Sequence, residues 1–206
     1  MGNTAEKTIN AKQANKTAIL DAASRLFIEG GINALSVRAI AKEAGVSTIG
    51  IYSHFDGKQG ILDTLYIEGF GLVVQSLDSI DTTQSNSTIL RQGAANYLAV
   101  ARDNKAHYRL IFGERQPGYE PSEPARTVAA LAFNKLTEWI ALLLPERASK
   151  QQRKLAAVQL WSFLHGTASL TDHDVSQLVD QAQWQKHVFS MLEAIHSGLV
   201  KQIEGA

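Results

Sequence analysis

Apolar residues recur at spacings of three and four along almost the whole chain after residue 17, and no stretch alternates with a period of two for long. The first spacing places apolar side chains on one face of an α-helix, whereas alternation is typical of a β-strand. Proline, which interrupts helices, does not occur before residue 117. The sequence therefore predicts an all-α fold.

Local residue patterns divide the chain into helices. Ser36 and Ser47 each precede a short helix as an N-cap, and Gly45 ends the first of these helices. Asp56, followed three residues later by Gln59, predicts a capping box at the start of a long fourth helix. The predicted helices cover residues 16–29, 37–44, 48–55, 58–77, 88–102, 104–112, 124–144, 149–170 and 180–203, with loops in "DSIDTTQSNS" and "RQPGYEPSEP".

Composition limits the class of protein. The chain has 206 residues, of which 45% are hydrophobic, and this is enough for a sizeable core. Cysteine is absent from the sequence, which excludes disulfides and thiolate metal sites and is typical of a reducing compartment. The polar start has no secretory pattern, and no apolar stretch is long enough for a membrane span. We therefore expect a cytoplasmic protein, and the formal net charge of zero indicates no particular partner.

The two short helices are joined by "EAGVS", a tight turn with a glycine, which is the helix-turn-helix arrangement. In the second of them, Ile51 and Phe55 share the inner side, while Thr48, Ile49 and Tyr52 lie on an outer arc without any acidic residue. A helix that enters the major groove of DNA must present no negative charge to the phosphates. It also needs small hydroxyl or methyl groups near its N-terminus to approach the bases. The outer arc therefore predicts contact with DNA.

Individual residues of the motif suit particular DNA contacts. Ile49 suits a thymine methyl group, Thr48 suits a base edge or a phosphate, and Gly50 allows close approach. Arg38, on the outer face of the preceding helix, is the candidate for a guanine edge. Hydroxyl, imidazole and ammonium groups nearby are candidates for phosphate contacts. The predicted DNA-binding residues are Ser36, Arg38, Ser47, Thr48, Ile49, Gly50, Tyr52, Ser53, His54 and Lys58.

A set of residues between Ala18 and Leu65 forms a recognisable signature. Its members are Ala22, Leu26, Phe27, Gly31, Ser36, Val37, Arg38, Ile40, Ala41, Ala44, Gly45, Val46, Ser47, Ile51, Tyr52, His54, Phe55, Lys58 and Leu62. The segment resembles the DNA-binding domain of the TetR family of bacterial transcription regulators. It departs from the family pattern at Gly50, where the family often has a hydroxyl or another side chain, and at Gln59, where an acid is common.

The sequence and the resemblance together give a domain organisation. We expect a flexible arm at residues 1–15, a helix-turn-helix DNA-binding domain at residues 16–60 with its motif at 36–55, and a larger helical domain at residues 61–206. The resemblance implies a repressor that binds double-stranded operator DNA as a homodimer and is released by a small molecule. It implies no enzyme activity, no cofactor and no metal. One short recognition helix covers few base pairs, so we expect a palindromic operator.

The resemblance also assigns tasks to the larger domain. It implies an effector pocket among the middle helices, although ordinary core or dimer packing is the alternative for each candidate residue. It implies a four-helix dimer interface formed by the last two helices of each subunit. The candidates for the pocket are Tyr97, Phe112, Phe133, Trp139, Trp161 and His165, and those for the interface are Gly166, Trp184, Val188, Met191, Leu192 and Ile195.

Two other classes of protein are alternatives to a regulator. One is a helical adaptor that binds only protein, which a salt-insensitive affinity for DNA would favour. The other is a metal-dependent enzyme similar to His-Asp phosphohydrolases, with ligands in "HGTASLTDHDVSQLVD". The residues available for that metal site are His165, Asp172, His173, Asp174 and Asp180, with His107 or His54 as a further ligand.

Overall fold

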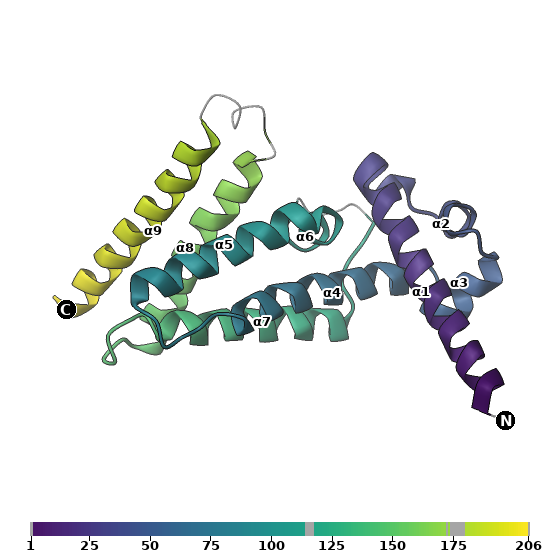
Figure 1. Cartoon of the computed structure of the whole chain (residues 1–206), viewed down its shortest axis with the longest axis horizontal. Coiled ribbons are helices and arrows are strands. Elements are labelled where there is room, and N and C mark those ends of the chain that lie inside the picture. Colours follow the sequence, from purple (N-terminus) through teal and green to yellow (C-terminus); the bar gives the residue numbers. More distant parts are fainter. Residues whose placement is uncertain (1, 114–117, 172, 174–179, 206) are drawn as a thin grey trace. The chain divides into compact units, whose positions relative to one another are not determined.

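The computed structural model describes residues 2–113, 118–171, 173 and 180–205, and every regular element in these ranges is a helix (Figure 1). The predicted all-α fold is thereby confirmed. In chain order the elements are α1 (Gly2–Gly30), the 3-10 helix η1 (Gly31–Ala34), α2 (Val37–Ala44), α3 (Thr48–Phe55), α4 (Lys58–Asp78), α5 (Asn86–Asp103), α6 (Lys105–Phe112), α7 (Glu123–Ala141), α8 (Lys150–Thr171) and α9 (Gln181–Glu204). Within the described ranges, no helix is long and apolar enough to cross a membrane.

The first helix begins at Gly2, whereas the sequence predicts a flexible arm up to residue 15. Residues 3–15 contain neither proline nor glycine, and they include alanine, lysine, glutamine and glutamate, which have high helix propensities. Extending an existing helix is easier than nucleating a new one. The helix that the sequence predicted from Lys16 therefore continues backward through this polar segment.

The chain forms two compact units, and their division differs from the expected boundary at residue 60. Unit 1 comprises Met1–Phe70 and Asn104–Ala129, and unit 2 comprises Gly71–Asp103 and Ala130–Ala206. Helices α4 and α7 each begin in unit 1 and end in unit 2. The helix-turn-helix segment therefore shares its unit with α6 and with the start of α7.

The core of unit 1 explains why α6 belongs to it. Phe27 of α1 is buried together with Ile40 of α2 and Ile51 of α3, and Leu110 of α6 and Tyr119 join the same apolar cluster. Helix α6 also packs against α1. Because these apolar groups leave water together, the three short helices α2, α3 and α6 are stabilised by burial in this shared core rather than by their own length.

Hydrogen bonds tie α4 to the segment that follows α6 within unit 1. The Asp63 carboxylate accepts a hydrogen bond from the Tyr119 hydroxyl at 2.9 Å and another from the Ser122 backbone N–H at 3.2 Å. Gln59 donates from its side-chain amide to the Glu120 carbonyl at 2.9 Å. Burial raises the pKa of Tyr119, and the hydrogen bond to Asp63 raises it further. The phenol is therefore protonated and available as a donor at neutral pH.

Unit 2 has its own core, built by α5, the end of α7, α8 and α9. Helices α8 and α9 lie side by side and run in opposite directions (Figure 1). Leu160 of α8 is buried with Val188 and Leu192 of α9 in one cluster. Gly93 of α5 allows the Trp139 ring to approach closely, since a Cβ at residue 93 would lie 2.6 Å from a ring carbon.

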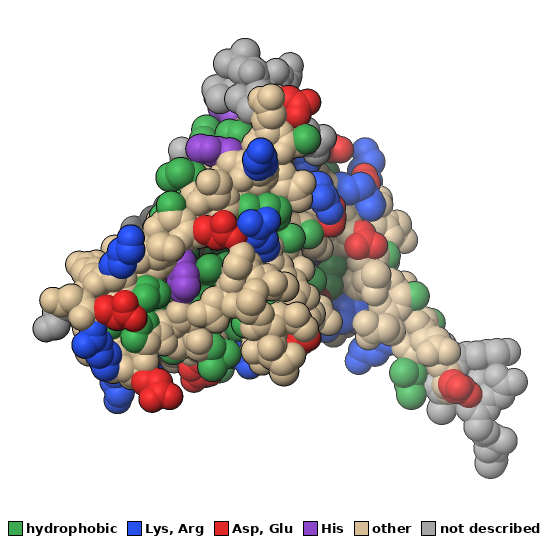
Figure 2. All heavy atoms as spheres, turned by 60° about the vertical axis from the view of Figure 1, so that its left-hand side comes forward, with side chains coloured by type: hydrophobic (Ala, Val, Ile, Leu, Met, Phe, Trp, Pro, Cys, Tyr) green, Lys and Arg blue, Asp and Glu red, His purple; other side chains and the backbone are tan. Residues whose placement is uncertain are grey.

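The surface drawn in Figure 2 mixes charges of both signs, with hydrophobic side chains between them. The chain as a whole has a formal net charge of zero at pH 7. Overall charge therefore does not attract a polyanion, and any such binding must depend on the positions of individual charged and polar groups.

Candidate nucleic-acid interface

The turn between α2 and α3 has the caps that the sequence predicted. The Ser36 hydroxyl oxygen accepts from the Ala39 N–H at 3.1 Å, and the Ser47 hydroxyl oxygen accepts from the Gly50 N–H at 3.1 Å. Gly45 ends α2 with φ 68, a left-handed conformation that favours glycine. These bonds satisfy amides at helix ends that would otherwise have no partner, so they fix where both helices begin.

The inward side of the motif is fully packed. Ile40 and Ala41 of α2 and Ile51 and Phe55 of α3 are buried in the core of unit 1, and Val46 in the turn packs partly against the same cluster. Since side chains at i and i+4 share a face, burial of Ile51 and Phe55 fixes the rotation of α3 about its own axis. The opposite side of α3 is thereby presented to solvent.

That outer side carries large apolar groups. Ile49 is 78% exposed and Tyr52 is 59% exposed, and at a spacing of three residues they are neighbours on the helix surface. Thr48 and Ser53 are also exposed, and the sequence of α3 contains no acidic residue. Burial of such apolar surface contributes about 25 cal/mol per Å². Contact between this face and a partner would therefore be favourable. The face would not repel a negatively charged partner.

The α3–α4 junction positions Tyr52 and corrects one prediction. Asp56 has φ 54 and ends α3 in the left-handed conformation, and Gly57 follows with φ 88. An N-cap needs extended backbone, so Asp56 cannot form the predicted capping box with Gln59, and that prediction is wrong. A Cβ at Gly57 would lie 3.2 Å from a Tyr52 ring carbon, so the glycine allows the ring to rest on the turn.

Arg38 and Lys58, the two predicted cations, have different surroundings. Arg38 is exposed on α2 and has no carboxylate within ion-pair distance among the described residues, whereas Arg25 of α1 pairs with Glu43 at 3.0 Å. Lys58 is half-buried, and its ammonium donates to the Ile32 carbonyl at 3.0 Å. Lys58 therefore ties the start of α4 to η1, a structural task that the sequence did not reveal.

The remaining polar candidates differ in whether a side-chain proton is available to a binding partner. Ser53 donates its hydroxyl proton to the Gly50 carbonyl at 2.9 Å. Ser36 and Ser47 accept from backbone amides, so their hydroxyl protons are still available to a partner. His54 is half-buried, with its ring centre 6.2 Å from that of Phe55.

Four of the six predicted effector-contacting residues lie together in unit 2. The Trp161 indole N–H donates to the Tyr97 hydroxyl at 3.0 Å, and the Trp161 ring lies 6.5 Å from Phe133 and 6.3 Å from His165. Burial lowers the pKa of His165, so its imidazole is neutral at pH 7. We call Tyr97, Phe133, Trp161 and His165 the aromatic cluster.

The other two candidates have different surroundings. Phe112 belongs to unit 1, where its ring packs edge-on against Phe70 at 5.6 Å and Tyr108 at 5.2 Å. Trp139 is buried in the core of unit 2, and its indole N–H makes no hydrogen bond within the described part of the chain. A buried N–H without an acceptor is costly, so this group favours a polar partner.

The predicted interface residues of α9 turn mostly inward. Val188 and Leu192 are 1% and 2% exposed and belong to the core of their own chain, and Trp184 and Ile195 pack against that core. Met191 is exposed, as is Gly166 of α8. Exposed apolar groups that the sequence analysis did not select are Leu155, Val158 and Leu170 of α8. The sequence shows the spacing of three between Leu155 and Val158, but not that these side chains are exposed.

Of the residues considered for a metal site, Asp172 and Asp174 lie outside the described residues. The described residues contain no group of three histidine, aspartate or glutamate side chains that could hold a metal ion.

Two family models match the chain. The model described as bacterial regulatory proteins of the tetR family matches residues 19–65, and the model described as a tetracyclin repressor-like C-terminal domain matches residues 90–195. The transcriptional repressor KstR2 from Rhodococcus jostii is 33% identical over 115 residues, which cover 52% of this chain and 56% of that protein. The chain spans about half the length of the curated relatives it matches.

Solved structures resemble the chain over most of its length. A regulatory protein of the tetR family from Rhodococcus RHA1 aligns with a TM-score of 0.70 and 17% identity, over 90% of this chain and 96% of that chain. A TetR variant from Acinetobacter baumannii, solved in complex with minocycline, aligns with a TM-score of 0.55 and 18% identity, over 89% and 95%. At these identities the likeness extends to the fold.

Proposed function

Because the chain belongs to the TetR family of bacterial regulatory proteins, we propose that it is a transcription regulator that binds double-stranded DNA through α2 and α3. It acts in the bacterial cytoplasm as a repressor, without catalytic activity, and a small molecule releases it from DNA. The observation that carries the proposal is the outer face of α3, where Ile49 and Tyr52 are exposed on a helix without acidic residues.

The outer face of α3 suits the major groove. The groove is about 12 Å wide and admits one helix, whose N-terminal residues approach the base edges. Ile49 contacts a thymine methyl group, and Thr48 contacts a base edge or a phosphate. The hydroxyls of Ser36 and Ser47 and the phenol of Tyr52 donate to phosphates, which fixes the position of the helix.

Arg38 is the proposed reader of a guanine. Its exposed guanidinium has no carboxylate neighbour in the described chain, so the planar fork is available for two parallel hydrogen bonds to O6 and N7. Lys58 contributes less to DNA affinity than a free lysine would, because its ammonium is already engaged with the Ile32 carbonyl.

The chain forms a twofold homodimer through α8 and α9. Both helices carry exposed apolar groups, namely Leu155, Val158 and Leu170 on α8 and Met191 on α9. Gly166 allows a close crossing, since no described residue of the single chain lies within 4 Å of a Cβ placed there. Two recognition helices then read a palindromic operator, with half-sites about 34–36 Å apart or a multiple of that distance.

The aromatic cluster is the proposed effector site of unit 2. It combines apolar rings with the phenol of Tyr97 and the neutral imidazole of His165, a mixture typical of small-molecule sites. An effector releases DNA only if it binds one conformation of the dimer better than the other.

Two arginine variants test the DNA proposal. Operator sites are first selected from a randomised duplex with the full chain, and affinities are then measured for a selected site and a random duplex. Arg38→Ala should weaken binding to the selected site by about 1–3 kcal/mol, roughly 5-fold to 150-fold, with a smaller effect on random DNA. Arg25→Ala is the matched control, because Glu43 already neutralises that exposed arginine.

Failure of selection to enrich any sequence would reject the proposal. Equal losses from the two arginine variants would reject the assignment of Arg38. A bound state whose affinity is insensitive to salt would favour an adaptor that binds protein, since phosphate contacts release counterions and weaken steeply as salt rises.

A further inference from the structure

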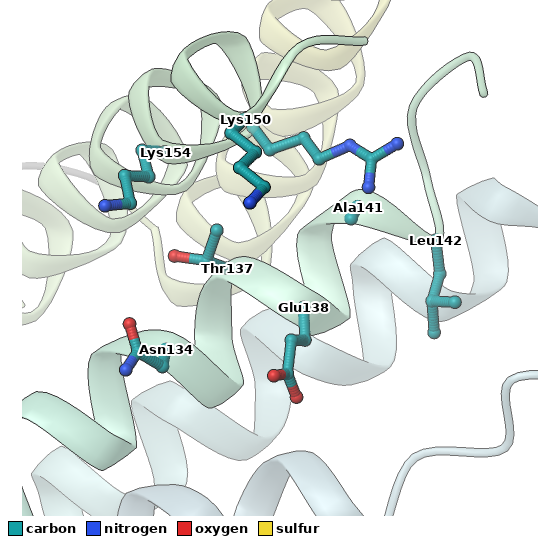
Figure 3. A pocket seen from close by; sticks show the side chains of 8 residues that line it. Asn134, Thr137, Glu138, Ala141, Leu142, Lys150 and Lys154 are labelled. Atoms are coloured by element: carbon teal, nitrogen blue, oxygen red, sulfur yellow. The ribbon is translucent and has the colours of Figure 1, made fainter. Parts of the chain in front are cut away.

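A groove with a volume of about 640 Å³ lies between α7 and the first turns of α8 (Figure 3). We propose that this groove binds a small anion that carries phosphate groups, at a site separate from the aromatic cluster. It shares no residue with the aromatic cluster. Its lining residues are Asn134, Thr137, Glu138, Ala141, Leu142, Lys150, Arg153 and Lys154.

Positive charge is concentrated on the α8 wall of the groove. Lys150, Arg153 and Lys154 stand at spacings of three and four, so they occupy one face of the helix. Figure 3 shows Lys150 and Lys154 extending from α8 on the side of Thr137. Among the described residues, no carboxylate lies within ion-pair distance of any of these three cations, whereas Arg91, Arg102 and Lys135 of the same unit each pair with an acid.

This arrangement is unfavourable for the chain alone. Lysines four residues apart on a helix repel each other, and the first turn of α8 contains no acidic residue to balance them. Cations near a helix N-terminus also oppose the positive end of the helix dipole. A bound anion offsets both the repulsion between the lysines and the unfavourable interaction with the helix dipole, so the groove is electrostatically complementary to a ligand with more than one negative charge.

Arg153 adds an observation that does not depend on the helix end. One terminal nitrogen of its guanidinium donates to the Glu146 carbonyl at 3.1 Å, which holds the group in place. Its Nε is buried and has no hydrogen-bond acceptor in the described part of the chain. A guanidinium that is already held in place loses little freedom when it binds a phosphate.

The α7 wall sets the chemistry of the rest of the ligand. Thr137 donates its hydroxyl proton to the Phe133 carbonyl at 3.0 Å, so it offers the ligand no donor, and the Asn134 amide is the neutral donor available. Glu138 is the one acid of the lining. Its charge also acts on Lys135, because it contributes to raising the pKa of that lysine after the larger contribution of the hydrogen bond to Asp78. The lining therefore carries three cations and one carboxylate, and the charge of that carboxylate also interacts with Lys135.

The size of the groove favours a small molecule over nucleic acid. Volumes of about 300–1,000 Å³ are typical of small-molecule sites, whereas a duplex is held by charges spread over an extended surface. The Ala141 and Leu142 side chains also give the groove an apolar part, which a bare phosphate backbone would not use.

The test uses pyrophosphate as the probe and the full chain at constant ionic strength. Calorimetric titration should show one saturable site per chain. Lys154→Gln should weaken pyrophosphate binding at least 10-fold, and Lys150→Gln should weaken it to a similar degree; both lysines are exposed, so neither change disturbs the core. Lys135→Gln is the matched control, since it removes a half-buried lysine of α7 that pairs with Asp78 at 2.7 Å, and it should change the affinity less than twofold.

Three results would overturn the proposal. The first is no saturation up to about 10 mM pyrophosphate, which is near the weak limit of specific binding. The second is an equal loss of affinity in all three variants, which would indicate screening by overall charge. The third is a Lys150→Gln/Lys154→Gln variant that loses affinity for a random duplex as much as for pyrophosphate, which would assign the groove to DNA. Retained DNA affinity, together with lost pyrophosphate binding, supports a separate anion site.

Discussion

Two glycines of α4, two residues apart, should respond oppositely to the same substitution. A Cβ at Gly69 would lie 2.9 Å from Ile111 Cγ2 and 3.4 Å from His107 Cβ, whereas a Cβ at Gly71 would meet no atom of the described residues within 4 Å. Alanine gains about 1 kcal/mol of helix propensity over glycine at either position. Gly71→Ala should therefore raise the free energy of unfolding by about 0.5–1 kcal/mol.

Gly69→Ala gains the same propensity but forces α4 and α6 apart within unit 1. The Ile111 methyl group is attached to a branched Cβ, so it cannot move without a change of χ1 or of the backbone. Overpacking of this kind costs about 1–3 kcal/mol, which exceeds the gain in propensity or cancels it. The difference between the two variants should be about 1–3 kcal/mol, with Gly69→Ala the less stable.

Urea unfolding followed by circular dichroism measures both values. Both substitutions replace glycine by alanine, so the contribution of helix propensity cancels when the two free energies of unfolding are subtracted. The remaining difference reports the packing around each residue. Equal stabilisation by both alanines would refute the claim that Gly69 is there for the close contact with α6. Equal destabilisation of the chain by both alanines would refute the claim that the surroundings of Gly71 have room for a Cβ.

Two further predictions concern unit 1 at high pH and the dimer. Since burial raises the pKa of Tyr119 above its unfolded value near 10, the resulting stability is present below pH 10 and is lost as the pH rises above it. Tyr119→Phe should lower the free energy of unfolding by about 1 kcal/mol at pH 7. Between pH 9 and 11, the free energy of unfolding measured in urea titrations should fall less for this variant than for the native chain. An equally steep fall would contradict this. Gly166→Ala should weaken dimerisation in sedimentation equilibrium without lowering the stability of the monomer, whereas an unchanged dimer would exclude a close helix crossing at this residue.

The features of the candidate interface that depend on residues close together in the sequence could be predicted from it. Ser36, Gly45 and Ser47 act on backbone groups within three or four residues, so their types and spacing suffice to predict both short helices. The burial of Ile51 and the exposure of Ile49 follow from the helical period in the same way.

Contacts between distant residues were not predictable. The hydrogen bond between Asp63 and Tyr119 joins residues 56 apart, and no local pattern indicates that the segment after α6 belongs to unit 1. The apolar stripe of α9 was recognised, but the same residue types can pack against their own chain or against another chain. Val188 and Leu192 take the first option, and this choice depends on where α8 lies.

The most direct test of the central claim places a negative charge on the outer face of α3. Ile49 is 78% exposed, so Ile49→Glu should leave the unfolding midpoint unchanged. Leu131→Glu is the control, because Leu131 of α7 is 61% exposed and lies in unit 2. If α3 enters the major groove, the new carboxylate faces phosphates and base edges, and a repulsion of several kcal/mol weakens binding of selected and random duplex by about 100-fold or more. Leu131→Glu should change neither affinity. Native-like DNA affinity in Ile49→Glu would contradict the assignment of α3 as the DNA-reading helix.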